Sequence, residues 1–287
     1  MKIETPLIIE NVIERHPCFN GKAARRFGRI HLPVAPKCNI QCNYCDRQYD
    51  CVNESRPGVT SRVVSPREAV IRVGRAVEVL PDIRVVGVAG PGEPLYNEAT
   101  LETFRLVNEN YPALHKCLSS NGLLLPEKLD IIKQLGLDTI TVTLNAIEPS
   151  IGAEIYSFVY YQGRKLTGIQ AAEVLLDNQL TGIRLAVEQG IVVKVNTVLI
   201  PTINDTHVPE VSRKIKELGV YVQNIMPLIP LSNFRHLAPP SLAQIKKIRT
   251  ECSEIIRQIT HCRQCRADAV GFLHQDISAK LFAPCAP

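Results

Sequence analysis

The sequence predicts an α/β fold in the form of an open, partial (βα)6 TIM-like barrel with its helices on the outside. Short runs rich in Val, Ile and Thr alternate with longer amphipathic runs, which is typical of parallel strands joined by helices. The strand-like runs are largely uncharged, as strands buried on both faces are, and six is fewer than the eight strands of a closed barrel. They are residues 30–36, 84–90, 115–120, 139–145, 192–200 and 221–229.

Signals for the beginnings and ends of helices lie between these runs. Ser65 offers an N-cap, Pro66 follows in the first turn, and Glu68 adds a capping-box carboxylate. Glycines end two of the later amphipathic runs, and Cys252 falls on the apolar face of the last one, where core packing is its expected role. The expected helices are 69–80, Pro126 to Gly136, His207 to Gly219, and 241–259.

Composition narrows the classes of function. The 287 residues are 45% hydrophobic, enough to form the core of one large domain or two small ones. No apolar run reaches the ~18 residues of a membrane span. The net charge of +5 is spread along a chain without Trp, which disfavours nucleic acid and suits an anionic ligand or an acidic partner. Ten cysteines without a secretory leader indicate a reducing compartment, so we expect a cytoplasmic protein.

The most informative motif is a loop of three cysteines, Cys38, Cys42 and Cys45, directly after the first predicted strand. This spacing lets thiolates converge on an iron–sulfur cube and leaves one iron open to chelate the amino and carboxylate groups of S-adenosylmethionine (SAM). Tyr44 completes the pattern C-x3-C-x-aromatic-C, which resembles the signature of the radical SAM superfamily. We therefore expect a [4Fe-4S] cluster on these thiols.

A zinc site is the alternative interpretation of these cysteines. Cys42 and Cys45 could pair with a second C-x2-C, formed by Cys262 and Cys265, which has the right ligand type. Zinc would leave Cys38 without a role. A disulfide framework is disfavoured in a long chain without a secretory leader.

Polar residues at the ends of other predicted strands are candidates to bind SAM. The segment 89–95 contains Gly92 and Glu93 and resembles the superfamily's GGEP motif, which holds the amino group of SAM, although Pro91 interrupts the glycine pair. A Gly-Pro turn with a solvated Glu is the alternative. Buried amides need partners that a nucleoside could supply, but each Asn could equally form turns or bond the local backbone. The expected SAM contacts are Tyr44, Gly92, Glu93, Ser119, Asn121, Asn145 and Asn196.

The other cysteines suggest further clusters. Apart from Cys252 and Cys285, five remain, too few to fill two cubes with thiolate alone. A histidine can replace thiolate at iron, and His31 is best placed, just before the cysteine loop. An isolated His on a strand can also be a packed, hydrogen-bonded residue.

Five uncommon motifs occur along the chain: His16-Pro17-Cys18, Val34 to Cys45, Tyr49 to Gly58, Ala89 to Gly92, and His261 to Gly271. Together, from His16 to Gly271, they resemble the NifB family of nitrogenase cofactor maturases. The resemblance implies a radical SAM barrel over 29–235, an N-terminal extension over 1–28 with an auxiliary cluster ligand, and a C-terminal helix and C-x2-C extension over 236–287. The extensions are expected to close over the cluster chamber.

The resemblance also implies a reaction. Two four-iron clusters, K1 and K2, fuse with a SAM-derived carbon and one added sulfur into an [8Fe-9S-C] precursor of the nitrogenase cofactor. One SAM donates a methyl group to a cluster sulfide, and a second yields the 5′-deoxyadenosyl radical that abstracts hydrogen from that methyl. The cofactors implied are three [4Fe-4S] clusters, two of them substrates, and SAM.

The resemblance assigns three ligands to each cluster. Glu54 is expected to handle protons or contact K1, and Arg56 to offset cluster charge, a surface Glu-Arg pair being the alternative. Asp46 and Glu93 stand where many members have Asn and Asp. The ligands are Cys38, Cys42 and Cys45 for the radical cluster, His31, Cys51 and Cys117 for K1, and Cys18, Cys262 and Cys265 for K2.

Partners follow from the same resemblance. Many relatives append a carrier domain resembling NifX after the K2 motif, whereas this sequence ends shortly after it, so we expect a separate carrier protein. Proteins that donate clusters and electrons are also expected as partners. No binding to nucleic acid or membrane is expected, and the protein is expected to be a monomer. The rivals are another radical SAM enzyme whose auxiliary clusters serve a peptide or RNA substrate, and a zinc-binding scaffold without catalysis.

Overall fold

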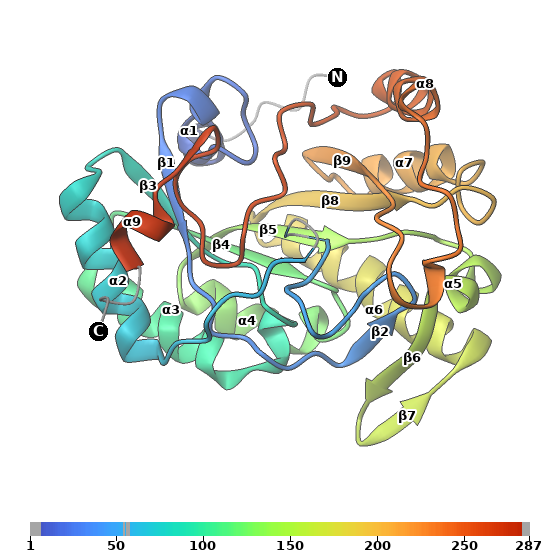
Figure 1. Ribbon diagram of the computed structural model, residues 1–287, viewed down its shortest axis with the longest axis horizontal. Helices are drawn as coiled ribbons and strands as arrows, with labels where there is room; N and C mark the ends of the chain where they lie inside the picture. The colour runs from blue at the N-terminus through green and yellow to red at the C-terminus, as the bar shows by residue number, and fades with distance from the viewer. Residues whose placement is uncertain (1–6, 54, 56–57, 283–287) are drawn as a thin grey trace.

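The computed structural model describes residues 7–53, 55 and 58–282. Its centre is an eight-stranded sheet in the order β11-β10-β1-β3-β4-β5-β8-β9 (Figure 1). From β1 to β9 the neighbouring strands are parallel, which confirms the partial barrel of six parallel strands. The strands are β1 (Gly28–His31), β3 (Ile83–Val88), β4 (His115–Ser120), β5 (Leu137–Thr143), β8 (Val192–Leu199), β9 (Val222–Pro227), β10 (Val270–Phe272) and β11 (Gln275–Asp276).

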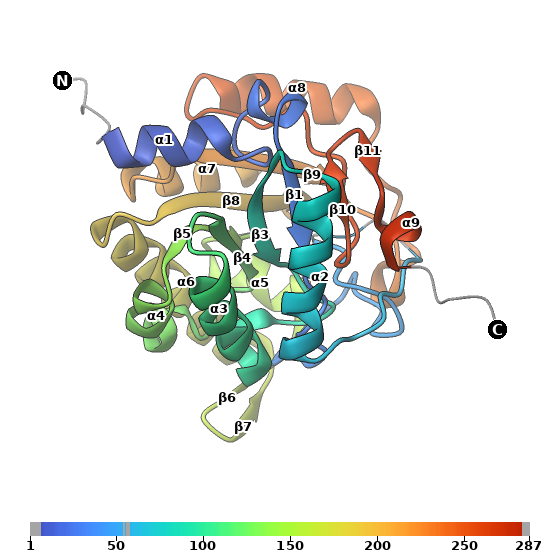
Figure 2. The ribbon, with the colours of Figure 1, turned by 90° about the vertical axis from the view of Figure 1, so that its left-hand side faces the viewer.

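Helices α2, α3, α4, α6 and α7 connect the parallel strands and pack against one face of the sheet (Figure 2). Apolar residues that alternate along the strands, such as Ile30, Val86 and Ile140, join Phe104 and Leu129 of the helices in one buried cluster. Within the described ranges, no helix is both long and apolar enough to cross a membrane. The helices are α1 (Leu7–Arg15), α2 (Pro66–Val79), α3 (Glu98–Asn110), α4 (Leu125–Gln134), α5 (Pro149–Ile155), α6 (Gly168–Glu188), α7 (Val208–Glu217), α8 (Leu242–Ser253) and α9 (Ser278–Phe282).

The first strand differs from its prediction. β1 begins at Gly28 and ends at His31, because Pro33 has no N–H to donate and the N–H of Val34 turns back to the carbonyl of Leu32 at 2.9 Å. β4 agrees with its prediction at both ends. Within these largely uncharged strands, three cations are buried: Arg29, which lies outside the predicted run, Lys116 and Lys194.

The last long helix is shorter than the predicted 241–259. α8 has the expected cap at Ser241 and buries Cys252, but it ends at Ser253. The following segment pairs instead with the open edge of β9: Gln223 N–H donates to the carbonyl of Arg257 at 2.9 Å, and Ile259 N–H donates to the carbonyl of Gln223 at 2.8 Å. Backbone pairing with a sheet edge therefore ends the helix early.

A second, three-stranded sheet was not predicted. It joins β2 (Ile40–Cys42) to the hairpin of β6 (Tyr156–Tyr161) and β7 (Arg164–Leu166), which projects at the bottom of Figure 1. Gln162 and Gly163 both have positive φ, 48° and 76°, as a type I′ hairpin turn requires. Because β2 contains Cys42, this sheet holds one side of the cysteine loop in place.

The chain after α8 crosses from one edge of the main sheet to the other (Figure 1). It leaves the edge of β9, contacts the N-terminal segment where His261 Nε2 lies 3.1 Å from the carbonyl of Pro17, and then pairs with β1 as β10. The N–H of His31 donates to the carbonyl of Ala269 at 2.8 Å. Both extensions therefore lie against the strands that carry candidate ligands.

Candidate active site

The face of the main sheet opposite the helical core is polar. Cα register places His31 beside Gly87, Gly87 beside Cys117, and Cys117 beside Thr139, so one row of side chains crosses four strands. A Cβ on Gly87 would lie 3.0 Å from His31 Cδ2, so the glycine leaves room for the imidazole. The next residues on the same face are Ser119, Thr141, Lys194, Thr143, Asn196 and Asn224.

Two pockets lie on this face. The loop pocket is lined by the cysteine loop, by Cys51 and by the carboxyl ends of β3, β4 and β5. The histidine pocket is lined by the N-terminal segment, β1, β8 and the crossing segment. Lining the loop pocket are Cys38, Cys42, Cys45, Arg47, Cys51, Asn53, Gly92, Glu93, Ser119, Ser120 and Asn121, among others. Lining the histidine pocket are Cys18, His31, Lys194, His261, Cys262, Arg263, Cys265 and Leu273.

The three thiols of the predicted radical cluster meet in the loop pocket. Gln41 Nε2 donates to the carbonyls of Cys42 at 3.0 Å and Cys45 at 2.8 Å, which curls the loop. Burial raises the pKa of Cys45 to about 11, and burial followed by the neighbouring cysteines raises the pKa of Cys42 well above its usual value. Because a bound metal deprotonates a coordinating thiol, a cluster would offset this cost, and the donor set fits a [4Fe-4S] cluster.

Gly92 lies directly under the cysteine loop. Its N–H donates to the carbonyl of Ala35 at 2.6 Å, and a Cβ would lie 2.4 Å from the carbonyl oxygen of Lys37. The N–H of Glu93 donates to that same Lys37 carbonyl at 2.8 Å. Close backbone packing against the loop therefore explains the glycine, whose contact with SAM stays a prediction.

Glu93 is the buried carboxylate of the loop pocket. Its Oε1 accepts from the hydroxyl of Ser120 at 2.7 Å and from Leu95 N–H at 3.0 Å, and its Oε2 accepts from Asn121 N–H at 2.6 Å. Burial raises the pKa of Glu93 to about 7, against the opposing effect of these donors. All three donors are neutral, and Arg47 in the same pocket acts on the carboxylate only through its charge. A ligand ammonium would therefore supply a charged hydrogen-bond donor that this set lacks.

Ser119 and Asn121 line the loop pocket beside the cysteines. Asn121 Nδ2 donates to Asn39 Oδ1 at 2.7 Å and lies 3.8 Å from Cys38 Sγ. Both residues are nearly buried. The two predicted SAM contacts at the end of β4 are therefore brought next to the predicted cluster ligands.

Tyr44, Asn145 and Asn196 belong to a buried network instead. Asn145 Nδ2 donates to the Tyr44 hydroxyl at 2.7 Å, and that hydroxyl donates to Asn53 Oδ1 at 3.0 Å. Asn196 Nδ2 donates to the carbonyl of Asn53 at 3.1 Å, and Asn145 Oδ1 accepts from Val198 N–H. Of these residues, Asn53 is the one that lines the loop pocket. The network joins β5 and β8 to the cysteine loop.

The histidine pocket gathers all three predicted K2 ligands, Cys18, Cys262 and Cys265, together with His31. His31 Nδ1 lies 3.1 Å from the carbonyl of Arg266 and must donate to it, which leaves the lone pair on Nε2. Burial, followed by the charge of Arg29, lowers the pKa of His31 to about 4. Neutral imidazole is the form that ligates metal, so His31 fits a ligand role.

The predicted K1 ligands are not gathered in one pocket. Cys51 lines the loop pocket, where its N–H donates to the carbonyl of Pro91 at 2.9 Å, whereas His31 lines the histidine pocket. Cys117 lies on β4 in the row of His31 and packs in a small apolar cluster with Cys18. Glu54 and Arg56 lie outside the described residues.

Two residues beside the predicted ligands went unnoticed in the sequence. Arg47 lines the loop pocket and donates from Nη2 to the carbonyl of Cys38 at 3.2 Å; its signal was a cation two positions after Cys45. Asp50 is buried and accepts from Ser61 N–H at 2.9 Å and from Ala267 N–H at 3.4 Å. Asp50 thus ties the Cys51 loop to the crossing segment, a contact that no local pattern indicates.

The zinc alternative receives no support from this geometry. Cys42 and Cys45 line the loop pocket, while Cys262 and Cys265 line the histidine pocket. In the part of the chain that the structure describes, no three His, Cys, Asp or Glu side chains are grouped to hold a single ion. A four-iron cube spreads its ligands farther apart than one ion does.

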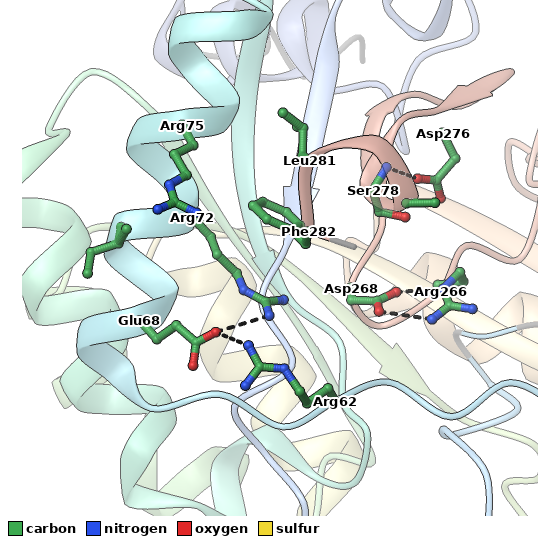
Figure 3. Close-up of a pocket in the computed structure, with 12 residues that line it drawn as sticks. Arg62, Glu68, Arg72, Arg75, Arg266, Asp268, Asp276, Ser278, Leu281 and Phe282 are labelled. Carbon is green, nitrogen blue, oxygen red and sulfur yellow. Dashed lines mark hydrogen bonds and ion pairs between the residues drawn. The ribbon is translucent and has the colours of Figure 1, made fainter. Parts of the chain in front are cut away.

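A larger hollow between α2 and α9 is a poorer candidate (Figure 3). Five of its charged side chains pair with one another: Glu68 with Arg62 and Arg72, and Arg266 with Asp268 at 2.6 Å. No cysteine is among its lining residues in the described ranges. The candidate site is therefore the pair of pockets on the polar face of the sheet.

Solved structures share this fold. A radical SAM methyltransferase from Sphaerobacter thermophilus aligns with a TM-score of 0.55 at 19% identity, covering 81% of this chain and 64% of that one. Streptococcus suis SuiB bound to S-adenosylmethionine aligns with a TM-score of 0.59 at 12% identity, covering 82% and 50%. At these identities the likeness concerns the fold alone.

Sequence relatives are closer. The Radical SAM superfamily model matches residues 32–230. The FeMo cofactor biosynthesis protein NifB of Chlorobaculum tepidum is 44% identical over 277 residues, covering 96% of this chain and 65% of the relative. The chain spans less than two thirds of that relative and of the Klebsiella pneumoniae one, at 62%. The protein of the same name from Methanocaldococcus jannaschii is 45% identical over 268 residues, covering 92% of this chain and 88% of the relative. By these matches the chain belongs to the radical SAM superfamily and, within it, to the NifB family.

Proposed function

We propose that the chain is a radical SAM carbide synthase that fuses two [4Fe-4S] substrate clusters, K1 and K2, with a SAM-derived carbon and an added sulfur into an [8Fe-9S-C] nitrogenase cofactor precursor. The observation that supports this most is the joint occurrence of two pockets on one face of one sheet, one with a radical SAM cysteine loop and one with three more cysteines and two histidines. A radical SAM enzyme with a single cluster would not need the cysteines of the second pocket.

In this proposal Cys38, Cys42 and Cys45 hold the resident [4Fe-4S] cluster, which supplies the electron that cleaves SAM reductively. Glu93 accepts hydrogen bonds from the amino group of SAM, supported by its burial and its neutral partners. Asn121 and Ser119 line the same pocket and would hold polar groups of the ligand. A network of hydrogen bonds acts indirectly, by holding Asn53 in place beside the cysteine loop. Its members are Tyr44, Asn145 and Asn196.

The substrate clusters are assigned to the remaining ligands. Cys18, Cys262 and Cys265 hold K2, which their common pocket supports. His31, Cys51 and Cys117 hold K1, with His31 Nε2 as a neutral and releasable ligand. The separation of Cys51 from His31 is compatible with a substrate that lies between the two pockets and is incompletely tethered. Glu54 is proposed to move protons and Arg56 to offset cluster charge.

The proposal includes a domain organisation and partner proteins. Residues 1–28 and 236–287 act as extensions that close over a barrel of 29–235. A monomer in the cytoplasm receives clusters and electrons from donor proteins and passes its product to a carrier protein.

Anaerobic reconstitution tests the proposal against a zinc scaffold and against a radical enzyme with a single cluster. Three cubes predict about twelve irons per chain and no zinc. About four irons, unchanged when Cys265 is replaced by Ala, would favour the single-cluster enzyme. A radical enzyme whose auxiliary clusters serve a peptide or RNA also binds additional iron, so it is distinguished by whether the product activates cofactor-deficient nitrogenase. Colourless protein with one or two zinc ions would favour the scaffold.

A further inference from the structure

Arg29 is a buried cation beside the histidine pocket. It lies on β1 two residues before His31, and its side chain is 1% exposed. Its Nη1 donates to the carbonyls of Gly271 at 2.5 Å and Phe272 at 3.1 Å, and its Nη2 donates to Cys265 Sγ at 3.1 Å. Its Nε has no hydrogen-bond partner in the described part of the chain. The guanidinium is thus held against one predicted K2 ligand.

None of the hydrogen-bond partners of Arg29 in the described residues is a carboxylate. A guanidinium stays protonated in proteins, and a buried charge is costly unless it is paired. The hydrogen bonds of Arg29 go to two carbonyls and to the sulfur of Cys265, while Asp276 acts on the guanidinium only through its charge. An anionic cluster bound at Cys265 would place a negative charge in direct contact with Nη2.

A structural tie between strands does not require this contact. β1 and β10 already pair through their backbones, with Arg29 opposite Gly271, and the bonds of Nη1 reinforce that pairing. The bond of Nη2 to Cys265 adds nothing to the pairing of the strands. Because the guanidinium is planar and rigid, fixing Nη1 on the carbonyls also fixes the direction in which Nη2 points.

We infer that Arg29 is a positioning residue for the iron–sulfur substrate held by Cys18, Cys262 and Cys265. It orients the Cys265 sulfur by a directed hydrogen bond and places a permanent positive charge next to the cluster. An iron-bound sulfur can still accept such a bond, and hydrogen bonds to cluster sulfurs help to set the reduction potential. This inference rests on the proposed function, since it needs a cluster at Cys265.

Two variants of Arg29 separate its roles. Arg29→Met removes the charge and the donors while keeping an apolar stem, and Arg29→Lys keeps the charge without the rigid fork. Lys116→Met is the matched control, because Lys116 is also buried on a strand but alternates to the face opposite Cys117, where its Nζ contacts the carbonyl of Pro112. A decrease in the free energy of unfolding that both Met variants share reflects the replacement of a buried cation and not the contact with Cys265.

The measurements use the chain of residues 1–287 in which Cys38, Cys42 and Cys45 are replaced by Ala, so that the radical cluster does not contribute. Arg29→Met should release iron to a chelator about 10- to 100-fold faster, the usual cost of losing an outer-shell partner. In this variant the midpoint potential of the cluster held by Cys18, Cys262 and Cys265 should fall. The reduced cluster is more negative than the oxidised one, so it loses more stabilisation when the nearby cation is removed. Arg29→Lys should recover most of the potential but not the slow release, and Lys116→Met should match the parent in both.

The variant Cys265→Ala in the same background shows whether a negative result concerns Arg29 or the cluster site itself. If it lacks about four irons while Arg29→Met matches the parent in release rate and potential, the role of Arg29 is refuted and the cluster site stands. If Cys265→Ala keeps the iron of the parent, no cluster depends on Cys265, and the proposed function and this inference both fall.

Discussion

The hydroxyl of Ser120 donates to Oε1 of Glu93 at 2.7 Å, joining the carboxyl end of β4 to the loop that follows β3. This contact fixes a carboxylate beside the cysteine loop in a buried place where its charge has only neutral donors. An incoming ammonium group would therefore meet an oriented acceptor.

SAM binding should depend on pH through Glu93. Burial raises the pKa of Glu93 to about 7 from the usual 4.5, so the carboxyl gains a proton as the pH falls below 7 and loses attraction for an ammonium. Calorimetric titration between pH 6 and 8 (~2 units around this pKa) should show affinity rising with pH, and Glu93→Gln should bind weakly with a flat profile. An equal slope in the variant would assign the pH dependence to another group.

The same pKa shift has a consequence for stability. The unfolded chain loses the proton of Glu93 near pH 4.5 and the folded, ligand-free protein near 7, so this group destabilises the fold as the pH rises between these values. The melting temperature of Glu93→Gln minus that of the parent should therefore increase as the pH rises from roughly 5 to 7. A constant difference would contradict the buried, raised carboxyl.

Gly92→Ala should disturb the cysteine loop. The added Cβ would lie 2.4 Å from the carbonyl oxygen of Lys37, so the loop must shift, at a cost of about 1–3 kcal/mol in the free energy of unfolding. We expect a lower urea midpoint and loss of about four irons. Gly163→Asn is the control, since Gly163 is in an open hairpin turn where Asn tolerates positive φ. Full iron in Gly92→Ala would mean that the loop tolerates the shift.

His31→Ala should lose or alter K1 while keeping the radical cluster, because Nε2 is the nitrogen left to ligate iron once Nδ1 bonds the Arg266 carbonyl. Iron analysis and electron paramagnetic resonance with and without SAM distinguish the two clusters. His115→Ala is the control, a histidine on β4 that pairs with Asp138. Unchanged cluster spectra in His31→Ala would remove it from the ligands.

Local patterns predicted much of the framework. β4 matches its prediction because His115 to Ser120 is a short run bounded by turn residues, and α7 begins and ends where the His207 cap and Gly219 indicate. The cysteine loop was recognisable because its ligands are close in sequence.

Local sequence patterns do not predict contacts between residues that are far apart in the chain. Arg29 and Cys265 are 236 residues apart, and nothing near either one shows that they meet. Asn145 is predicted to contact SAM because an amide in an apolar run needs partners, and that contact stays a prediction. The side-chain partners that the structure shows for Asn145 are Tyr44, Tyr156 and Val198. The early end of α8 depends on the free edge of β9, which a local helical pattern cannot report.

The most direct measurement supplies the reconstituted chain with SAM and reductant and asks whether the product activates cofactor-deficient nitrogenase. The proposed carbide synthase predicts activation that requires SAM and is lost in Cys38→Ala and in Cys265→Ala. No activation by protein that contains all three clusters and cleaves SAM would contradict it.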